Sequence, residues 1–375
     1  MVYAIGLMSG TSLDGVDAAL VEVTGVNEET KVALIEFTTL PIPSTTIENI
    51  RASFSLSTSN SALISSLNVE LGYLFAAAAK AVSELAGISL EKVDFIATHG
   101  QTIYHIPEAT EDYYASTLQI GEPAVIAEET GCTVISNFRP RDMAVGGQGA
   151  PIVPYSEVIL YQYPERTRLL QNIGGIGNVT VIPPNGEMKE VLAFDTGPGN
   201  MIMNELTQHF YNESYDRDGQ YSAAGIVNEE LLEEWMGHPY ISREAPKTTG
   251  REDFGAQFVK KYLASYKLEP NDWIATATAF TAQSIAANVK AYCTPETDLI
   301  IGGGGSYNLT LVQMIADNLP EVNVIRQEDL GYSSDAKEAV AMVILGNQTL
   351  QRQPGNVPSA TGAQKSVILG NVTYY

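Results

Sequence analysis

Two apolar runs joined by a turn of small residues open the chain, and this pattern constrains the fold more than any other feature. The runs span residues 2–7 and 16–23, and residues 9–15 between them read SGTSLDG. Two strands joined by such a turn predict a β-hairpin. Residues 168–182 repeat the pattern around the turn GGIGN at 174–178. Because each half begins in the same way, the sequence predicts an internal duplication on the scale of a domain.

The first turn carries residue types that proteins use to hold phosphate. Glycines let backbone N–H groups approach a ligand closely, and Ser and Thr hydroxyls add donors. The carboxylates of Asp14 and Asp17 could hold a hydrated Mg²⁺ beside a phosphate. An ordinary Gly/Asp hairpin turn is the alternative. The candidate phosphate-binding residues are Gly10, Thr11, Ser12, Leu13, Asp14, Gly15, Val16 and Asp17.

The net charge of −23 limits which partners fit this chain. It disfavours nucleic acid and anionic membrane surfaces. A phosphate site must therefore depend on backbone amides, helix N-termini and Mg²⁺ rather than on a basic patch. Cys132 and Cys293 predict neither a disulfide framework nor a metal site. We find no secretory signal and no apolar run of membrane-spanning length, so we expect a soluble protein of a reducing compartment.

Strands and helices alternate after the opening hairpin. Residues 31–40 predict a third strand, and a helix is expected from Asn60 or Ser61 to a stop at Gly87. Buried strands at 93–98 and 133–136 flank a predicted helix at 122–129, which favours an α/β fold with a mixed sheet. The length of 375 residues suggests two domains. We expect them at 1–137 and 138–349, with the tail 350–375 packing back on the first.

Glycines also follow strands in the second half. A buried strand at 298–301 ends in four glycines before a helix predicted at 309–319, and α/β proteins usually bind ligands at such strand ends. Neither a G-x-G-x-x-G fingerprint within a βαβ unit nor a Walker loop occurs, so each glycine cluster alone is a weak signal. The candidate nucleotide-binding residues of this half are Gly174, Gly175, Gly303, Gly304 and Asn308.

Asp195 is the carboxylate that best suits catalysis. It follows a strand predicted at 191–194 and precedes Gly-Pro-Gly, which leaves room for a substrate, and Asn200 can cap the helix that follows. An Asx-turn satisfied by local amides is the alternative. Glu338 is a second catalytic candidate, although Asp335-x-x-Glu338 also matches a helix capping box.

The irregular segment 137–148 is expected to connect the domains and to line a cleft between them. Its Arg139 and Arg141 could bind an anionic substrate group in a bidentate manner, with surface ion pairs as the alternative. His99 could be a polar anchor in that cleft or a hydrogen-bonded structural histidine.

Six segments together carry a resemblance to a known family. They are GLMSGTSLDGVDAAL, THGQTI, SNFRPRDMAVGGQGAPIVP, NIGGIGN, FDTGPGN and the ending PSATGA, in order from Gly6 to the C-terminal tail. The chain resembles the anhydro-N-acetylmuramic acid kinase family, which belongs to the sugar kinase, Hsp70 and actin superfamily.

The resemblance implies a duplicated RNase-H-like (actin-like ATPase) fold with ATP and Mg²⁺ in the cleft. Residues 10–17 would match the ATP phosphate loop, and 302–308 would lie near the adenosine. Asp195 matches the catalytic aspartate of the family, and Glu338 matches an acidic residue that assists near the metal or the substrate. The substrate-binding candidates are His99, Gln101, Arg139 and Asp142.

The implied reaction opens 1,6-anhydro-N-acetylmuramic acid with water and phosphorylates O6, giving N-acetylmuramic acid 6-phosphate and ADP in cell-wall recycling. The opening strand ends Met8-Ser9-Gly10, without the Asp that many relatives in the superfamily place there, so the metal is expected to lie elsewhere. A kinase for another anhydrosugar such as levoglucosan remains an alternative, as does an Hsp70- or actin-like ATPase. Arg139 and Arg141 favour the muramic substrate, because its lactyl carboxylate needs donors. A cytoplasmic enzyme is expected, and a homodimer would be typical of the family.

Overall fold

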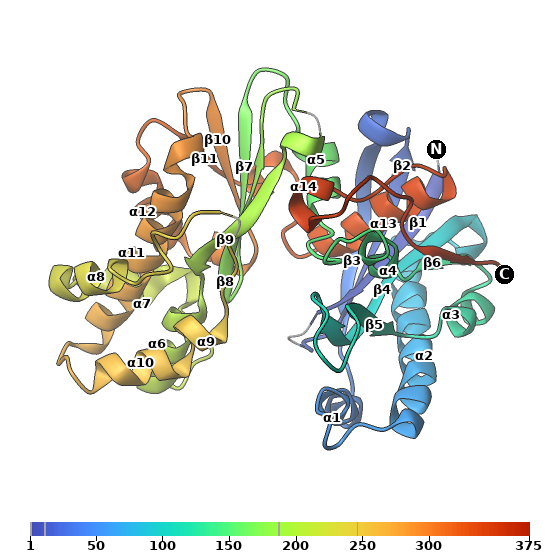
Figure 1. Ribbon diagram of the computed structural model, residues 1–375, viewed down its shortest axis with the longest axis horizontal. Coiled ribbons are helices and arrows are strands. Elements are labelled where there is room, and N and C mark those ends of the chain that lie inside the picture. Colours follow the sequence, from blue (N-terminus) through green and yellow to red (C-terminus); the bar gives the residue numbers. More distant parts are fainter. Residues whose placement is uncertain (1, 11–12, 187, 246) are drawn as a thin grey trace. The chain divides into compact units, whose positions relative to one another are not determined.

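The structure, a computed structural model, describes residues 2–10, 13–186, 188–245 and 247–375 and divides into two compact units (Figure 1). Unit 1 comprises Met1–Tyr161 and Ala336–Tyr375, and unit 2 comprises Gln162–Asp335. Thr11 and Ser12 of the predicted phosphate loop lie outside the described residues.

Unit 1 is built on a seven-stranded mixed sheet. Its order is β12-β6-β4-β1-β2-β3, and β5 pairs with β4. The first three strands form an antiparallel meander, whereas β4 is parallel to both β1 and β6. The strands are β1 (Val2–Ser9), β2 (Val16–Thr24), β3 (Lys31–Leu40), β4 (Val93–Ile106), β5 (Ser116–Ile120), β6 (Thr133–Ser136) and β12 (Asn371–Thr373).

Helices cover both faces of this sheet. Ile5 and Leu7 of β1 join a core cluster with Phe75 of α2, while a Cβ at the intervening Gly6 would lie 1.8 Å from the carbonyl oxygen of Ala339 in α13. Since successive residues of a strand point to opposite faces, α2 and α13 pack on opposite faces of the sheet. The helices of unit 1 are α1 (Ser44–Ser53), α2 (Ser61–Ala86), α3 (Pro123–Thr130), α4 (Arg139–Met143), α5 (Pro154–Tyr161), α13 (Lys337–Leu350) and α14 (Pro358–Thr361).

Unit 2 has a five-stranded sheet of order β11-β10-β7-β8-β9. Here too the first three strands are an antiparallel meander, while β10 pairs in parallel with β7 and β11 pairs in parallel with β10. Both sheets therefore share one arrangement. The first three strands lie in the order third, second, first, and two parallel strands follow beside the first, β4 and β6 in unit 1 and β10 and β11 in unit 2, which is the duplicated RNase-H-like arrangement that the family resemblance implies. The strands are β7 (Thr167–Ile173), β8 (Ile176–Ile182), β9 (Leu192–Pro198), β10 (Thr297–Gly302) and β11 (Asn323–Arg326).

The helices of unit 2 surround a core that is centred on α11. Most residues of α11 are buried, and many of them are alanines and threonines. The buried hydroxyls of Thr276 and Thr278 donate hydrogen bonds to the backbone carbonyls four residues earlier in the helix. The helices are α6 (Met201–Tyr211), α7 (Gln220–Ala224), α8 (Glu229–Met236), α9 (Arg251–Phe254), α10 (Ala256–Leu263), α11 (Pro270–Val289) and α12 (Leu309–Asn318). Short 3₁₀ helices span Asn27–Glu29, Leu90–Lys92, Met188–Glu190, Arg217–Gly219, Lys290–Tyr292, Gly304–Tyr307 and Gln327–Leu330.

The structure divides the chain elsewhere than the sequence analysis does. Residues 138–161 belong to unit 1, and so does all of 336–349, because α13 packs on β1, β2 and β4. The tail also lies in unit 1, where β12 pairs with β6. The segment 137–148 is therefore not a connection between the units, and it contains α4.

Two strands extend beyond their expected ends. β4 continues to Ile106 because its second half pairs with β5, and β9 continues to Pro198 because it pairs with β8 as far as Ile176. Asp195 consequently lies inside a strand rather than after one.

By length and composition alone, α2 is the one helix among the described residues that could cross a membrane. One helix of this kind is weak evidence, since the core helices of soluble proteins pass the same test. Residues of α2, among them Leu67, Leu71 and Phe75, are buried in the core of unit 1.

Candidate active site

The β1–β2 hairpin carries the predicted phosphate loop of unit 1. Leu13 is in the left-handed region at φ 61°, and its backbone N–H donates to the Gly10 carbonyl at 3.4 Å. The side chains of Leu13 and Val16 are buried in the core, so they anchor the loop rather than face a ligand. A Cβ at Gly15 would lie 2.4 Å from Thr39 of β3, so this position requires glycine.

The two aspartates of the hairpin differ in their surroundings. Asp14 is exposed, while Asp17 is half-buried and its Oδ1 accepts a hydrogen bond from Thr39 Oγ1 at 2.7 Å. Asp17 also raises the pKa of the Glu338 carboxyl, so these two acidic groups of unit 1 interact. No group of three or more His, Cys, Asp or Glu forms a metal cluster within the described ranges.

Gln101 ties β4 to the phosphate loop. Its Oε1 accepts from Ser9 Oγ at 2.7 Å, and its Nε2 donates to the Gly10 carbonyl at 3.4 Å. Gln101 is fully buried. These contacts make it a residue that positions the loop.

His99 and Arg139 form a pair within unit 1. Arg139 Nε donates to His99 Nε2 at 2.9 Å, while His99 Nδ1 donates to the Gly100 carbonyl at 2.8 Å. This arrangement requires a neutral imidazole. Burial, with the nearby Arg139 guanidinium, lowers the pKa of His99 to about 3. His99 is therefore a hydrogen-bonded histidine that orients Arg139.

Arg139 is half-buried, and its NH1 group donates to the Gly149 carbonyl at 2.7 Å. Burial lowers the pKa of the guanidinium and Glu338 raises it. Arg141 is exposed. Of the two arginines, Arg139 is thus the one that the structure holds close to other candidate residues.

Asp142 is buried, and its carboxylate binds other segments of the same chain. Its carboxylate accepts hydrogen bonds from Gly149 N, Asn356 Nδ2 and Thr361 Oγ1 at 2.8–2.9 Å. These donors come from the Gly-rich loop and from the C-terminal tail. We therefore assign Asp142 to holding these segments together and do not carry it into the substrate-binding set.

Glu338 lies in the first turn of α13. The capping-box interpretation was wrong, because the helix begins at Lys337 with Ala336 as N-cap and no side-chain cap. The side chain is exposed, yet the pKa of its carboxyl is raised, first because surrounding protein displaces part of the bulk water and then by Asp17 and Glu157. Lys337 opposes this shift, and its own Nζ pairs with Glu157 in a buried ion pair.

Asp195 is half-buried in β9 and is held by a distant loop. Its Oδ2 accepts from the backbone N–H of Thr249 at 2.9 Å, and its own N–H donates to the Lys247 carbonyl at 3.0 Å. Since these partners lie more than fifty residues away, the local Asx-turn interpretation was wrong. Burial raises the pKa of the carboxyl, while Thr249 and Lys247 lower it.

Lys247 is a residue of this site that the sequence analysis missed. It is 3% exposed, and its Nζ donates to the carbonyls of Tyr240 and Ile241 and lies 4.6 Å from the centre of the Tyr240 ring. The Tyr240 hydroxyl in turn donates to the Asp195 carbonyl at 2.9 Å. A lone lysine in a loop gives no sequence signal for this role, because only the folded chain brings it to Asp195.

Helix α11 fixes the strand that carries Asp195. Ser284 Oγ donates to the Thr196 carbonyl at 2.5 Å, and Thr281 Oγ1 donates to the Gly199 carbonyl at 2.9 Å. Gly197 has φ 119°, and a Cβ there would lie 2.4 Å from Ser284 Oγ. The strand therefore approaches α11 more closely than a side chain would allow.

The glycine segments of unit 2 converge. The carbonyls of Gly174 and Gly175 accept from the backbone N–H groups of Asn200 and Gly199 at 2.7 and 2.9 Å. A Cβ at Gly303 would lie 2.6 Å from Asn172 Oδ1, next to the same hairpin. Among the described residues, a Cβ at Gly304 would meet only Asn200 Nδ2, at an ordinary contact distance of 3.7 Å.

Two asparagines lie next to these glycine segments, and only one of them caps a helix through its side chain. Asn200 does not cap α6 through its side chain, and its Nδ2 instead donates to the Ile173 carbonyl at 3.3 Å. Asn308 is buried and caps α12, with Oδ1 accepting from Leu311 N at 2.9 Å. The Asn308 side chain therefore holds the end of the glycine segment.

Comparison with known proteins identifies the family. The family model described as "Anhydro-N-acetylmuramic acid kinase" matches residues 2–375. A protein of that name from Bacillus cereus (strain Q1) is 54% identical over 379 residues, covering 100% of this chain and 99% of that protein. Another, from Clostridioides difficile (strain 630), is 52% identical over 376 residues, covering 99% and 98%. The chain belongs to the anhydro-N-acetylmuramic acid kinase family.

Solved structures give more distant similarities. The (R)-2-hydroxyglutaryl-CoA dehydratase component A of Acidaminococcus fermentans has TM-score 0.47 and 11% identity, over 92% of this chain and 97% of that chain. A ROK family glucokinase from Streptomyces griseus has TM-score 0.40 and 11% identity, over 91% and 98%. The assignment of the fold depends on the shared strand order of the two sheets.

Proposed function

We propose that this chain carries out the reaction after which its family is named, the ATP-dependent conversion of 1,6-anhydro-N-acetylmuramic acid to N-acetylmuramic acid 6-phosphate. Water adds its hydroxide to C1 and gives up a proton, and the bond between C1 and O6 breaks. O6 then attacks the γ-phosphorus of ATP, and ADP leaves. The observation that carries the proposal is a family match over residues 2–375 in which Asp195 is a held, half-buried carboxylate.

Asp195 is the proposed general base. One carboxylate oxygen accepts from Thr249 N, which fixes the direction of the group. Burial raises the pKa of the carboxyl, and a more basic carboxylate is a better proton acceptor for water. Lys247 and Thr249 offset part of that rise, so the base stays ionised over a wider pH range.

The residues that bind ATP are proposed in both units. In unit 1 they are the described hairpin residues Gly10, Asp14, Gly15 and Asp17, with Leu13 and Val16 as buried anchors. In unit 2 they are the converging segments at Gly174, Gly175, Gly303 and Gly304, with Asn308 as a structural cap. Backbone groups dominate this set, as expected for a chain of net charge −23.

We propose that Asp17 and Glu338 of unit 1 would hold Mg²⁺. Asp17 contributes to the raised pKa of the Glu338 carboxyl, and Mg²⁺ typically binds one or two carboxylates and keeps several waters. Bound there, the ion would supply charge neutralisation for phosphoryl transfer. Asp14 is exposed, so we propose it only as a second candidate for binding Mg²⁺.

Arg139 is the proposed partner of the substrate's lactyl carboxylate. A guanidinium held by His99 and Gly149 is pre-oriented, which favours recognition of a carboxylate. His99 and Gln101 are proposed to position Arg139 and the phosphate loop rather than to contact the sugar. A cytoplasmic location and a homodimer remain proposals that follow from the family.

The reaction is tested by incubating the protein with ATP and each sugar and measuring ADP and phosphorylated sugar. We expect transfer to 1,6-anhydro-N-acetylmuramic acid to exceed transfer to levoglucosan, which lacks the carboxylate. The Asp195→Asn variant should lose about 10²–10⁴-fold in turnover while ATP affinity stays nearly unchanged. Asp317→Asn, on the exposed end of α12, is the matched control.

Retained turnover in Asp195→Asn would reject the base, and ADP release without any sugar requirement would reject the kinase. A preference for levoglucosan would assign the site to another anhydrosugar.

A further inference from the structure

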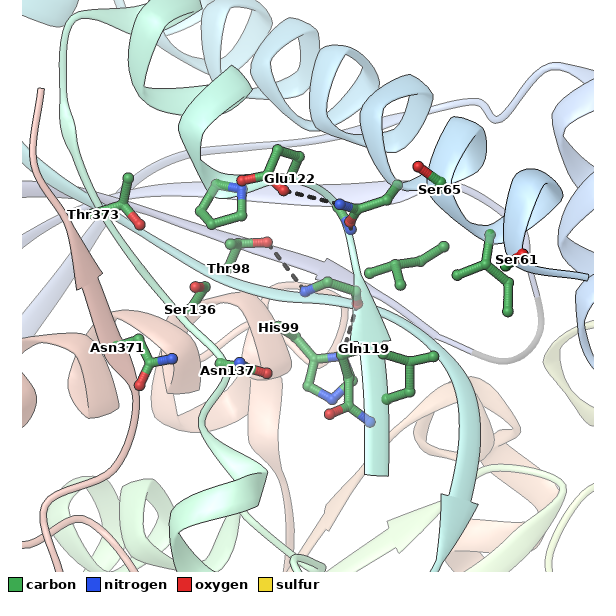
Figure 2. Close-up of a pocket in the computed structure, with 17 residues that line it drawn as sticks. Ser61, Ser65, Thr98, His99, Gln119, Glu122, Ser136, Asn137, Asn371 and Thr373 are labelled. Carbon is green, nitrogen blue, oxygen red and sulfur yellow. Dashed lines mark hydrogen bonds between the residues drawn. The ribbon is translucent and has the colours of Figure 1, made fainter. Parts of the chain in front are cut away.

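A cavity of about 520 Å³ lies on the α2 side of the unit 1 sheet (Figure 2). Its walls come from the first turns of α2, the middle of β4, the end of β6, strand β5, the start of α3 and strand β12. Thr98, His99 and Gly100 of β4 line it, whereas Ala97, which precedes Thr98 and points to the other face, packs on α13, where a Cβ at Gly346 would lie 2.8 Å from it. The cavity therefore lies on the opposite face of the sheet from α13, which carries Glu338.

The lining is polar and almost uncharged. It contains no lysine or arginine from the described part of the chain, and its one carboxylate, Glu122, is occupied by hydrogen bonds from Asn68 Nδ2 and Ala124 N. The imidazole of His99 is neutral because its Nε2 accepts from Arg139. Such walls cannot balance the charge of a phosphate or a carboxylate ligand.

Many of the polar groups that face the cavity have unused hydrogen-bonding capacity. Thr98 is 1% exposed, and its Oγ1 accepts from Gly100 N while its hydroxyl hydrogen has no acceptor among the described residues. Gln119 Oε1 is buried and lacks a partner. Both residues line the cavity, and buried polar groups normally have partners. The side chains of Ser61, Ser65, Ser136, Asn137, Asn371 and Thr373 also make no hydrogen bond to any described residue and surround the same space.

Apolar groups complete the lining on one side. Ile64, Leu118, Ile120 and Pro123 contribute to the wall formed by α2, β5 and the start of α3. A surface with hydroxyls and amides around an apolar strip matches a sugar ring, which has C–H faces and a polar rim. The volume also lies in the usual range of small-molecule sites, about 300–1,000 Å³.

We propose that this cavity is a second binding site, separate from the phosphoryl-transfer site, and that it takes an uncharged carbohydrate bearing an amide. The amide N–H would donate to Gln119 Oε1, and a ring hydroxyl would accept from Thr98 Oγ1. The His99 ring links this wall to Arg139, because its Nδ1 donates to Gly100 and its Nε2 accepts from Arg139.

The probe is N-acetyl-D-glucosamine, titrated into the full chain and followed by saturation-transfer NMR. D-glucosamine and D-glucuronate are the cationic and anionic comparison probes. We expect saturable binding of the neutral probe and much weaker binding of both charged probes.

Two adjacent serines of α2 give matched variants. Ser65 lines the cavity and Ser66 does not, although both are exposed. Ser65→Trp should weaken binding of N-acetyl-D-glucosamine at least about tenfold by filling the space, whereas Ser66→Trp should leave it unchanged. Gln119→Leu, which removes the unpartnered acceptor, should also weaken binding. Thermal melting of each variant checks that it folds.

Equal binding by wild type and by both Ser65→Trp and Gln119→Leu would overturn the proposal. Absence of saturable binding up to the solubility limit would overturn it too, as would preference for D-glucuronate. Displacement of the probe by 1,6-anhydro-N-acetylmuramic acid in simple competition would show that the cavity is part of the acceptor site and not a second one. None of these outcomes depends on whether Asp195 is the catalytic base.

Discussion

Asp195 shows how single residues set the chemistry of this protein. Its carboxyl is half-buried, which raises its pKa, but Thr249 N and the Lys247 ammonium favour the charged form. Lys247 in turn is buried against Tyr240, which costs it hydration and lowers its own pKa. Lys247 therefore acts as a positioning residue that tunes the proposed base without touching the reaction.

Replacing Lys247 should shift the pH dependence of the reaction. A general base must be deprotonated, so the rate falls as the pH drops through the pKa of Asp195. In Lys247→Met the stabilising positive charge is lost, so the pKa of Asp195 should rise and the acidic limb of the turnover profile should move to higher pH. Lys247→Arg, which keeps the charge, is the control. An acidic limb that stays in place in Lys247→Met would contradict the tuning role.

His99 should make the stability of unit 1 depend on pH. The pKa of the imidazole is about 3 in the folded chain, against the model-compound value of 6.5 expected when unfolded. Between these values the unfolded chain binds the extra proton, so the stability contributed by neutral His99 is present above pH 6.5 and is lost as the pH falls towards 3. His99→Gln keeps an acceptor for Arg139 but does not titrate.

Urea unfolding at several pH values measures this effect. The free energy of unfolding should fall less steeply below pH 6.5 in His99→Gln than in the wild type. Parallel pH dependences in the two proteins would show that His99 is not held neutral.

At the scale of elements, close backbone contacts fix which helix lies on which sheet face. Gly6 lets β1 approach α13 so closely that any side chain would meet the Ala339 carbonyl. A similar close contact occurs at Gly197, where the backbone of β9 packs against α11 with no side chain of its own between them. Both contacts support site residues, since α13 carries Glu338 and β9 carries Asp195.

Gly6→Ala should therefore destabilise unit 1. A Cβ 1.8 Å from a carbonyl oxygen forces β1 and α13 apart, and overpacking of this kind typically costs about 1–3 kcal/mol or more. Gly237→Ala is the control, because Gly237 is exposed and has φ −72°, which alanine adopts readily. Denaturant unfolding of both variants tests this expectation. A Gly6→Ala variant as stable as Gly237→Ala would mean that β1 and α13 are not in such close contact.

At the scale of the whole molecule, the chain leaves unit 1, forms unit 2 and then returns. The returning segment supplies α13 to one face of the unit 1 sheet and β12 to its edge beside β6. Asn356 and Thr361 of the same segment also bind the buried carboxylate of Asp142. The C-terminal segment is therefore part of the core of unit 1.

Deleting residues 371–375 should loosen unit 1 and leave unit 2 intact. Strand β6 would lose its antiparallel partner, so its amides should exchange with solvent faster, while those of β8 and β9 should not change. Hydrogen exchange read by mass spectrometry measures both. Deleting only Tyr374 and Tyr375, which are exposed, is the control. Equal protection of β6 in the two truncated proteins would show that β12 does not stabilise the sheet.

The sequence by itself determined the repeated strand–turn–strand pattern, the helix at 61–86 with its Asn60 cap and Gly87 stop, and the family. These depend on local periodicity, turn residues and short motifs, which a linear sequence displays directly. Only the tertiary structure decided the course of the chain between the units, the strand position of Asp195 and the approach of Lys247 and Thr249 to it. Those features arise from contacts between residues far apart in the chain, and no local pattern records which distant segments will pack together.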